Sequence, residues 1–222
     1  MSLIHHTTLK PTKLELLADW LPARPWYRAG SDQPSLTKAG GFRLDDPAGE
    51  VGIEFMVVAD GSTAYHVPLT YRGSPLEEIG DALIGTSEHG VLGTRWIYDG
   101  TRDPVLLTQL VALIQGKAEP QAQSQTDTPD PTVLSWPAVD GPLSVAGFNA
   151  AGDAEATTVT VSATAGELAL RVAGELALRI DRVLRPVTGD AAAPGTVSAT
   201  WALPDGTRVR GVFATASYDP LV

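Results

Sequence analysis

The sequence predicts an α+β fold in two parts, an N-terminal antiparallel sheet with helices and a small, mostly antiparallel β domain. Capped helix starts occur in the first half, alternating apolar residues occur in both halves, and the stretch between them has almost no large apolar side chain. With 222 residues, of which 43% are hydrophobic, the chain can bury two small cores. We therefore expect an N-terminal domain at 1–116, a linker at 117–132 and a β domain at 133–222.

Two helices in the first half have clear start and stop signals. Thr12 and Glu15 have the spacing of a capping box, and Pro22 ends the helix that follows because proline cannot continue it. Asp103 opens a later helix, and Gly116 closes it. A wide apolar stripe predicts that this later helix packs on other elements: Leu106, Leu107, Leu110, Val111, Leu113 and Ile114.

A further helix start is expected at Ser74, since Pro75 and Glu77 complete an S-x-x-E pattern with proline at the first helical position. This helix is expected to lead into a glycine-rich stretch and then into a strand at 94–98. Near the N-terminus, residues 3–9 predict a short first strand.

Apolar residues recur at every second position from Lys38 onward, which predicts strands. Asp60 and Gly61 form a turn signal, so the strands on either side are expected to pair as an antiparallel hairpin. Pro68 has no backbone N–H, which places its strand at a sheet edge or at a bulge. The acidic turn at 45–50 is expected to bond backbone amides rather than a metal, because hard cations need more converging oxygens.

Residues 117–132 are rich in Pro, Gln, Thr and Asp, a composition typical of linkers. Beyond them, GELALRV at 166–172 recurs as GELALRI at 174–180, and we expect two strands joined by a turn at 173–174. A turn signal at 203–206 predicts another hairpin in the C-terminal part.

Composition excludes several classes of function. Acidic residues outnumber Lys and Arg by 26 to 16, for a formal charge of −10, so nucleic acid is not expected as a partner. The chain has no cysteine and therefore no disulfide, thiolate metal site or cysteine nucleophile. The longest apolar run is too short to cross a bilayer and no signal peptide is visible, so we expect a cytoplasmic protein that binds no membrane.

Several short sequence blocks, found in order along the first half, carry a family resemblance. They include Trp20-Leu21-Pro22, Pro25-Trp26-Tyr27, Asp46-Pro47-Ala48-Gly49-Glu50, Val67-Pro68-Leu69-Thr70-Tyr71-Arg72, Glu88-His89, Val91-Leu92-Gly93 and Trp96-Ile97-Tyr98-Asp99. These blocks resemble the N-terminal cap domain of actinobacterial maltokinases and related aminosugar kinases. The resemblance implies a cystatin-like domain, a strongly curved antiparallel sheet that holds a helix, normally placed ahead of a two-lobed kinase that phosphorylates maltose with ATP.

The residues after Gly116 depart from that family. Phosphoryl transfer needs a phosphate-cradling loop, a lysine, a catalytic aspartate and metal-holding side chains, and the following residues supply no such set. We therefore expect a stand-alone cap-like protein without kinase activity, catalytic residues, cofactor or metal. Other catalytic patterns are weak, because no nucleophile-elbow sequence surrounds Ser87 and His89, and because a turn and a hairpin explain Glu50 and Glu54 equally well.

Two functional hypotheses follow. The first is a non-catalytic interaction or regulatory module linked to maltose, trehalose and glycogen metabolism, whose partner is a sugar kinase or a glucan-metabolising enzyme. The second is a carbohydrate-binding protein that holds maltose or a glucan through surface aromatics and neighbouring polar groups. The candidate ligand-binding residues are Trp26, Tyr27, Tyr71, Arg72, Glu88, His89, Arg95 and Trp96. A competing interpretation assigns Tyr71 and Trp96 to the core and has Trp26 cover a helix end. The sequence leaves the oligomeric state open.

Overall fold

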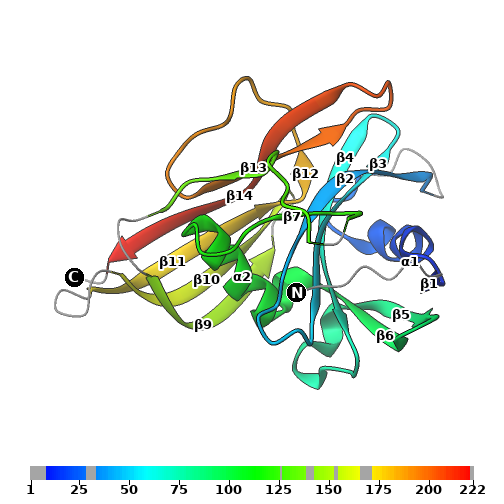
Figure 1. The fold of residues 1–222 in the computed structure, drawn as a ribbon, viewed down its shortest axis with the longest axis horizontal. Coiled ribbons are helices and arrows are strands. Elements are labelled where there is room, and N and C mark those ends of the chain that lie inside the picture. The colour runs from blue at the N-terminus through cyan, green and yellow to red at the C-terminus, as the bar shows by residue number, and fades with distance from the viewer. Residues whose placement is uncertain are drawn as a thin grey trace.

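The described part of the chain has an α+β fold in which a long, mostly antiparallel sheet curls around an α-helix (Figure 1). The computed structural model describes residues 9–28, 34–125, 127–138, 143–152, 155–165 and 172–220. Within these residues the main path of the sheet runs β1-β5-β6-β4-β3-β2-β13-β14-β11-β10-β9. The path therefore passes directly from N-terminal strands to C-terminal strands where β2 meets β13.

The strands of the first half are β1 (Leu9–Lys10), β2 (Leu36–Leu44), β3 (Gly52–Asp60), β4 (Thr63–Arg72), β5 (Leu83–His89), β6 (Gly93–Asp99) and β7 (Gln121–Ala122). Those of the second half are β8 (Leu134–Ser135), β9 (Leu143–Gly152), β10 (Ala156–Ala165), β11 (Val172–Asp181), β12 (Val183–Leu184), β13 (Thr196–Ala202) and β14 (Arg208–Pro220). The helices are α1 (Lys13–Trp20) and α2 (Pro104–Ile114), with 3-10 turns η1 (Leu21–Ala23), η2 (Glu77–Ala82) and η3 (Gly100–Arg102).

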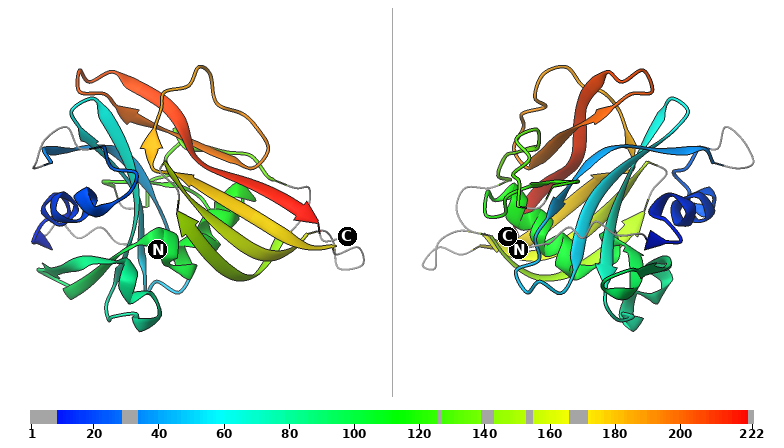
Figure 2. Two further views of the ribbon diagram at one scale, coloured as in Figure 1. Left: turned by 180° about the vertical axis from the view of Figure 1, so that it is seen from behind. Right: turned by 45° about the vertical axis from the view of Figure 1, so that its right-hand side comes forward.

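The two α-helices lie on opposite faces of the N-terminal strands. α2 lies between β2–β4 and the C-terminal strands, while α1 lies on the far side of β2–β4 (Figure 1, Figure 2). Apolar side chains of α2 share one core cluster with β2, β3, β11, β13 and β14. Those of α1 share a second cluster with β3, β4 and β6. We call the two sides of the N-terminal strands the α2 face and the α1 face.

Both α-helices begin as the sequence predicts. The Thr12 hydroxyl accepts the N–H of Glu15 and the Glu15 carboxylate accepts the N–H of Thr12, which completes the capping box. The Asp103 carboxylate accepts the N–H of Val105 at the start of α2. Gly116 follows the end of α2 with a φ of +67°, a left-handed conformation that favours glycine.

The β3–β4 hairpin is confirmed, whereas the predicted edge position of Pro68 is wrong. Pro68 pairs with Phe55 in unbroken register, and β4 has partners along its other side as well. On that other side β12 pairs with Tyr65 and the His66 N–H donates to Arg182, while β6 begins to pair only at residue 69. The nitrogen of Pro68 points to the same side as that of His66, into the gap between β12 and β6, so no ladder bond is lost.

The helix expected from Ser74 is wrong in extent. Residues 77–82 form only the 3-10 turn η2, whose N-cap is Leu76 without a side-chain cap. Residues 83–89 then form strand β5, which pairs with β6. The Gly85 backbone lies against α1, where an added Cβ would stand 2.7 Å from Leu16, so close packing on the helix favours the strand.

The predicted linker lies against the sheet. Its β7 pairs with β2, the Ala122 N–H donates to Thr128, and the Ser135 hydroxyl donates to Leu113 at the end of α2. The core cluster around α2 also joins residues from both sides of this segment. The division into a domain at 1–116 and a domain at 133–222 stays a prediction, but the two parts are packed together.

The C-terminal strands agree with the sequence in part. The turn at 203–206 is confirmed, with Gly206 at a φ of +84° between β13 and β14. The second copy of the repeated heptad lies in β11, whereas residues 166–171 of the first copy lie outside the described residues. The turn expected at 173–174 is wrong, because β11 runs through both residues and pairs them with β10.

Two further expectations concern the chain's ends and membranes. Of the first strand predicted at 3–9, only Leu9 lies within the described residues, where it begins the short strand β1. Among the described helices, none has the length and apolarity needed to cross a bilayer.

Candidate functional site

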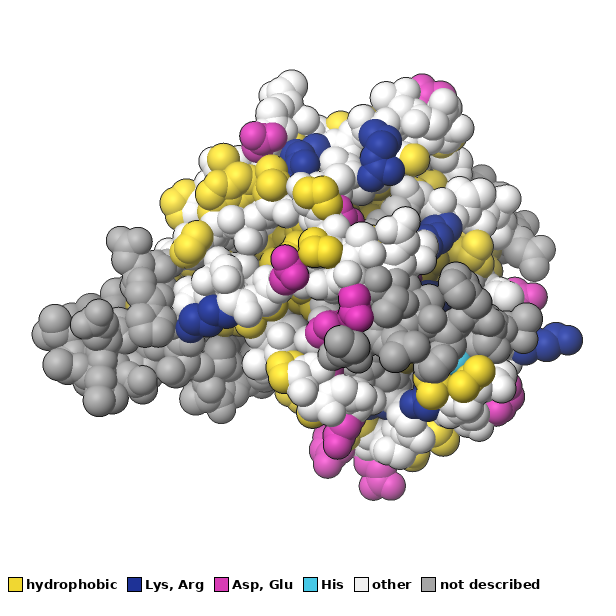
Figure 3. Space-filling model, viewed as in Figure 1, with side chains coloured by type: hydrophobic (Ala, Val, Ile, Leu, Met, Phe, Trp, Pro, Cys, Tyr) yellow, Lys and Arg dark blue, Asp and Glu magenta, His cyan; other side chains and the backbone are white. Residues whose placement is uncertain are grey.

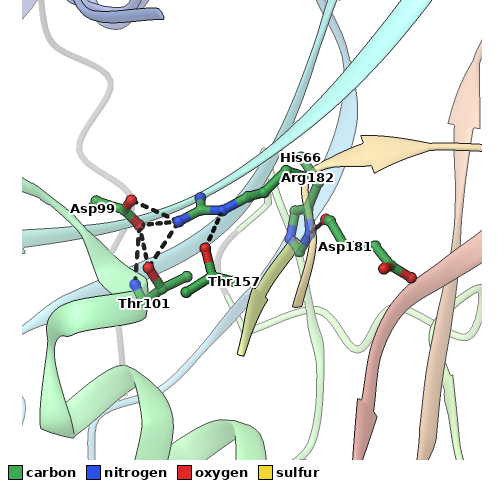
Figure 4. A network of polar contacts seen from close by, with 6 residues as sticks. All are labelled: His66, Asp99, Thr101, Thr157, Asp181 and Arg182. Carbon is green, nitrogen blue, oxygen red and sulfur yellow. Dashed lines mark hydrogen bonds and ion pairs between the residues drawn. The ribbon is translucent and has the colours of Figure 1, made fainter. Parts of the chain in front are cut away.

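A cluster of polar side chains is buried where the N-terminal and C-terminal strands meet (Figure 4). We call it the Arg182 junction, and it consists of the side chains of His66, Asp99, Thr101, Thr157 and Arg182 together with the backbone carbonyl of Asp181. Arg182 lies between β11 and β12 and is 1% exposed. Its backbone carbonyl accepts the His66 N–H of β4, and its own N–H donates to Glu155. The side chain of Arg182 therefore begins beside the gap between β12 and β6 along β4.

The guanidinium of Arg182 connects the two halves of the chain. Its Nη2 donates to both carboxylate oxygens of Asp99, at 2.8 and 2.6 Å, and to the Thr101 hydroxyl at 2.7 Å. Its Nε donates to the Thr157 hydroxyl at 3.0 Å. The ring of Trp26 lies against its other side, with the guanidinium carbon 5.1 Å from the ring centroid. A buried charge therefore has a carboxylate, hydroxyls and an aromatic ring as partners.

His66 is fully buried beside this cation and is neutral. Burial lowers the pKa of His66 to about 3, with the Arg182 charge lowering it further and the bond to the Asp181 carbonyl opposing the shift. Because its Nδ1 lies 2.9 Å from that carbonyl oxygen, Nδ1 carries the proton and Nε2 is the unprotonated nitrogen. The ring packs between Phe55 and Phe213, which belong to different halves of the chain.

The Arg182 junction has the properties of a structural contact that holds two parts of the chain together, rather than of a reaction site. Its cation and carboxylate neutralise each other, and its histidine is held away from water. Removal of one partner from such a buried pair is costly, because the other charge remains without compensation. The junction therefore fixes β6 and β4 of the first half against β10–β12 of the second.

The eight predicted ligand-binding residues lie on two faces of the sheet rather than in one cluster. Arg72 pairs with Trp96 across β4 and β6, and Tyr71 pairs with Ile97, so these two pairs point to opposite faces. By this register the α2 face carries Arg72, Glu88 and Trp96, and the α1 side carries Trp26, Tyr27, Tyr71, His89 and Arg95. A single saccharide cannot contact both groups, and a binding role for any of them stays a prediction.

On the α1 side, the aromatic candidates pack into the core. Trp26 is 4% exposed and lies against the rings of Trp20 and Tyr65, at centroid distances of 5.8 and 6.1 Å, as expected for a residue that covers a helix end. The Tyr27 hydroxyl donates to Asp60, and burial together with that carboxylate raises the pKa of Tyr27. Tyr71 donates its hydroxyl to the buried Glu54.

On the α2 face, the charged candidate Arg72 has an internal partner. Its Nε and Nη2 donate to the two oxygens of Asp103 at 2.8 and 2.7 Å, and these hydrogen bonds raise the pKa of Arg72. Trp96 is half-buried and packs against Ile79, Ala82 and Tyr98.

The β5–β6 hairpin holds the other polar candidates. His89 Nδ1 accepts the N–H groups of Val91 and Leu92, and Arg95 donates to the Leu92 carbonyl, so both stabilise the turn. Glu88 accepts the hydroxyl of Thr94 across the hairpin. The turn itself carries two exposed apolar side chains, Val91 at 63% and Leu92 at 45%. Sequence reasoning did not select these two, although an apolar pair bounded by Gly90 and Gly93 is a usable signal.

The weaker catalytic patterns do not form sites. The Ser87 hydroxyl donates to the Pro11 carbonyl rather than to His89. Glu50 lies exposed in the turn before β3, while Glu54 is buried within β3, so the two carboxylates are not paired. In the acidic turn, Asp46 accepts the amides of Ala48, Glu50 and Val51, as expected. Within the described residues, no group of His, Asp and Glu has the arrangement needed to hold a metal ion.

Comparison with known families confirms the resemblance of the first half. The family model of the maltokinase N-terminal cap domain matches residues 20–103. This range begins at the end of α1 and ends at the N-cap of α2, and it contains β2–β6 together with the exposed β5–β6 turn.

Proposed function

We propose that the chain is a non-catalytic cap module that binds a sugar kinase, because the family model of the maltokinase N-terminal cap domain matches residues 20–103. The proposal places it in the cytoplasm, in the metabolism of maltose, trehalose or glycogen. It includes the cystatin-like arrangement implied by the family resemblance, with α1 held against the antiparallel strands β3, β4 and β6.

The observation that carries the proposal is the apolar surface of the β5–β6 hairpin. Among the described residues, the large apolar side chains exposed by more than a third are Leu83, Val91, Leu92 and Val187. Val91 and Leu92 are neighbours in the β5–β6 turn, whereas Leu83 lies at the other end of β5. Figure 3 shows hydrophobic side chains among charged ones at this end of the molecule, at the lower right. Exposed apolar residues rimmed by polar ones are typical of protein interaction sites.

The polar contacts around this surface support a non-catalytic role. Arg72 is held by Asp103, and Ser87 is held by a backbone carbonyl. His89 is occupied with the amides of the turn that presents Val91 and Leu92. Catalysis needs groups free to contact a substrate, whereas His89 keeps the turn in one conformation, as a docking surface requires.

The test is a binding measurement between the purified chain and a purified maltokinase by sedimentation velocity and calorimetry. Leu92→Asp and Val91→Asp place a charge in the proposed contact and are expected to weaken binding by at least about tenfold, as for an interface anchor. Val187→Asp is the matched control, because Val187 is 39% exposed but lies far along the chain in the β12–β13 connection. If the turn variants bind as tightly as the parent, or the parent binds no sugar kinase, the docking role is wrong.

A second candidate function, carbohydrate binding, is favoured by the partly exposed side chain of Trp96, which pairs with Arg72 across β4 and β6. A sugar ring stacked on Trp96 would find the Arg72 guanidinium nearby. Calorimetry with maltose, maltooligosaccharides and glycogen tests this function. Heat that saturates with saccharide and disappears in a folded Trp96→Ala variant would favour it over the docking role.

A further inference from the structure

Two backbone N–H groups of the β5–β6 turn share one acceptor, the side chain of His89. Its Nδ1 accepts the N–H of Val91 at 3.3 Å and the N–H of Leu92 at 3.0 Å. No backbone carbonyl of the described residues accepts either N–H. The side chains of Val91 and Leu92 are exposed, so packing does not hold them in place. The order of this apolar pair therefore depends on the imidazole of His89.

These contacts determine the protonation state of the His89 ring. A backbone N–H only donates, so Nδ1 carries no proton and the proton of the neutral ring lies on Nε2. Protonation of Nδ1 produces a cation in which both ring nitrogens are donors. Nδ1 then faces two N–H groups as a donor itself, and both hydrogen bonds are lost. The turn conformation of the structure thus belongs to neutral His89.

Arg95 is the charged group on the same face of the hairpin as His89. By the register of β5 with β6, Arg95 pairs with Ser87 and His89 pairs with Gly93, which places both side chains on one face. Arg95 donates to the carbonyl of Leu92, so it holds the turn from its other backbone group. A guanidinium keeps its charge at every pH at which the protein is folded, so this contact does not change with protonation.

The other charged groups around this end of β5 come from β1, β5 and α1. Lys10 of β1 stands opposite Glu88 of β5 in the ladder, on the face away from His89. Helix α1 packs on Gly85 of β5 through the apolar Leu16. The charged residues of α1 are Lys13, Glu15 and Asp19. Between pH 7.5 and 5.5, histidine is the side-chain type among these that ordinarily changes its charge.

We propose that His89 is a pH-sensitive switch of the docking turn. Neutral His89 presents Val91 and Leu92 in one conformation, and protonated His89 releases them. A partner that meets the released turn must order it again on binding, which costs affinity. The inference rests on the proposed docking function and adds the condition under which the turn is ready to bind: weak acid lowers the affinity for the partner.

The first experiment follows the turn in the full chain without a partner, by NMR of nitrogen-15-labelled protein between pH 7.5 and 5. The amide signals of Val91 and Leu92 are expected to move together with the ring signals of His89 and to lose protection against solvent exchange. In His89→Asn a side-chain oxygen replaces Nδ1 as acceptor and does not titrate, so these amides are expected to stay protected. Amide signals that do not follow the His89 ring would overturn the proposal.

The second experiment measures binding to a purified maltokinase by calorimetry at pH 7.5 and 5.5. Between these values the parent chain is expected to lose about tenfold more affinity than His89→Asn, as for loss of hydrogen bonds, and this comparison cancels pH effects on the kinase. Glu88→Gln is the matched control, because it removes a neighbouring titratable group and is expected to keep the pH response of the parent. Equal acid weakening of the parent and His89→Asn would overturn the proposal.

Together the two experiments separate the switch from the docking role. A parent chain that binds no sugar kinase at pH 7.5 contradicts the docking role, while the amide titration still decides whether His89 controls the turn. Binding at pH 7.5 combined with amides that ignore the protonation of His89 supports docking and overturns the switch. Circular dichroism at both pH values checks that each variant is folded.

Discussion

The two buried polar clusters of this protein hold charge in different ways. At the Arg182 junction, one cation faces one carboxylate, and hydroxyls and an aromatic ring surround them. At Glu54, one carboxylate serves Lys13 while Lys38 and Arg43 stand beside it. The first cluster is balanced within the chain and joins its two halves, so we expect its loss to act on stability. The second, the Glu54 cluster, places a buried carboxylate beside cations, so we expect its contribution to stability to depend on acid.

The largest expected effect is that of Arg182→Met. The variant leaves the Asp99 carboxylate buried without its cation, which is expected to lower the free energy of unfolding by about 3–5 kcal/mol. Arg185→Met is the matched control, because Arg185 forms an ion pair with Glu155 at the surface and is expected to contribute less than about 1 kcal/mol. Urea denaturation measures both. Equal losses in the two variants would mean that the junction does not hold the halves together.

Sequence reasoning could not have found this junction from local patterns. Arg182 and Asp99 are 83 positions apart, and His66 and Asp181 are 115 positions apart. The signal available in the sequence is that Arg182 stands between the buried Ile180 and Leu184, at a position where an apolar residue would be usual. The identity of its partner depends on how β12 and β6 share one side of β4, which is tertiary information.

Elements with short-range causes were predicted well. The capping box of α1 and the turn at Asp60 were found because their signals lie within a few residues. The helix predicted from Ser74 is wrong in extent. Packing on α1 and pairing with β6 determine the structure of residues 83–89 more strongly than a local cap pattern does. The predicted ligand-binding residues do not form one cluster for a related reason. Adjacent residues such as Tyr71 and Arg72 point to opposite faces of a strand.

The pH dependence of stability tests the role of His66 in the Arg182 junction. The folded His66 pKa of about 3 lies below the ordinary value of 6.5, so at falling pH the unfolded chain binds a proton that the folded protein does not. Stability is therefore complete above pH 6.5 and declines below it, by about 1.5 kcal/mol between pH 6.5 and 5. His66→Phe is expected to flatten this slope, as measured by urea denaturation at each pH. An unchanged slope in the variant would assign the effect to other groups.

The Glu54 cluster differs from the junction in the pH range over which it affects stability. Burial alone would raise the pKa of Glu54, but the Lys13 charge and the bonds from Lys13, Tyr71 and Gln123 hold it below the ordinary 4.5. This depressed pKa adds stability above pH 4.5 that is lost as pH falls through the folded value.

Lys13→Met removes the ion pair and is expected to lower the free energy of unfolding by about 1–2 kcal/mol at neutral pH, as for loss of a hydrogen bond to a charged group. It also raises the pKa of Glu54, so the decline of stability below pH 4.5 becomes shallower while the decline due to His66 between pH 6.5 and 5 remains. Urea denaturation across both ranges checks this separation. If Lys13→Met altered the stability between pH 6.5 and 5 instead, the two clusters would be coupled through the sheet, and the contrast between them would fail.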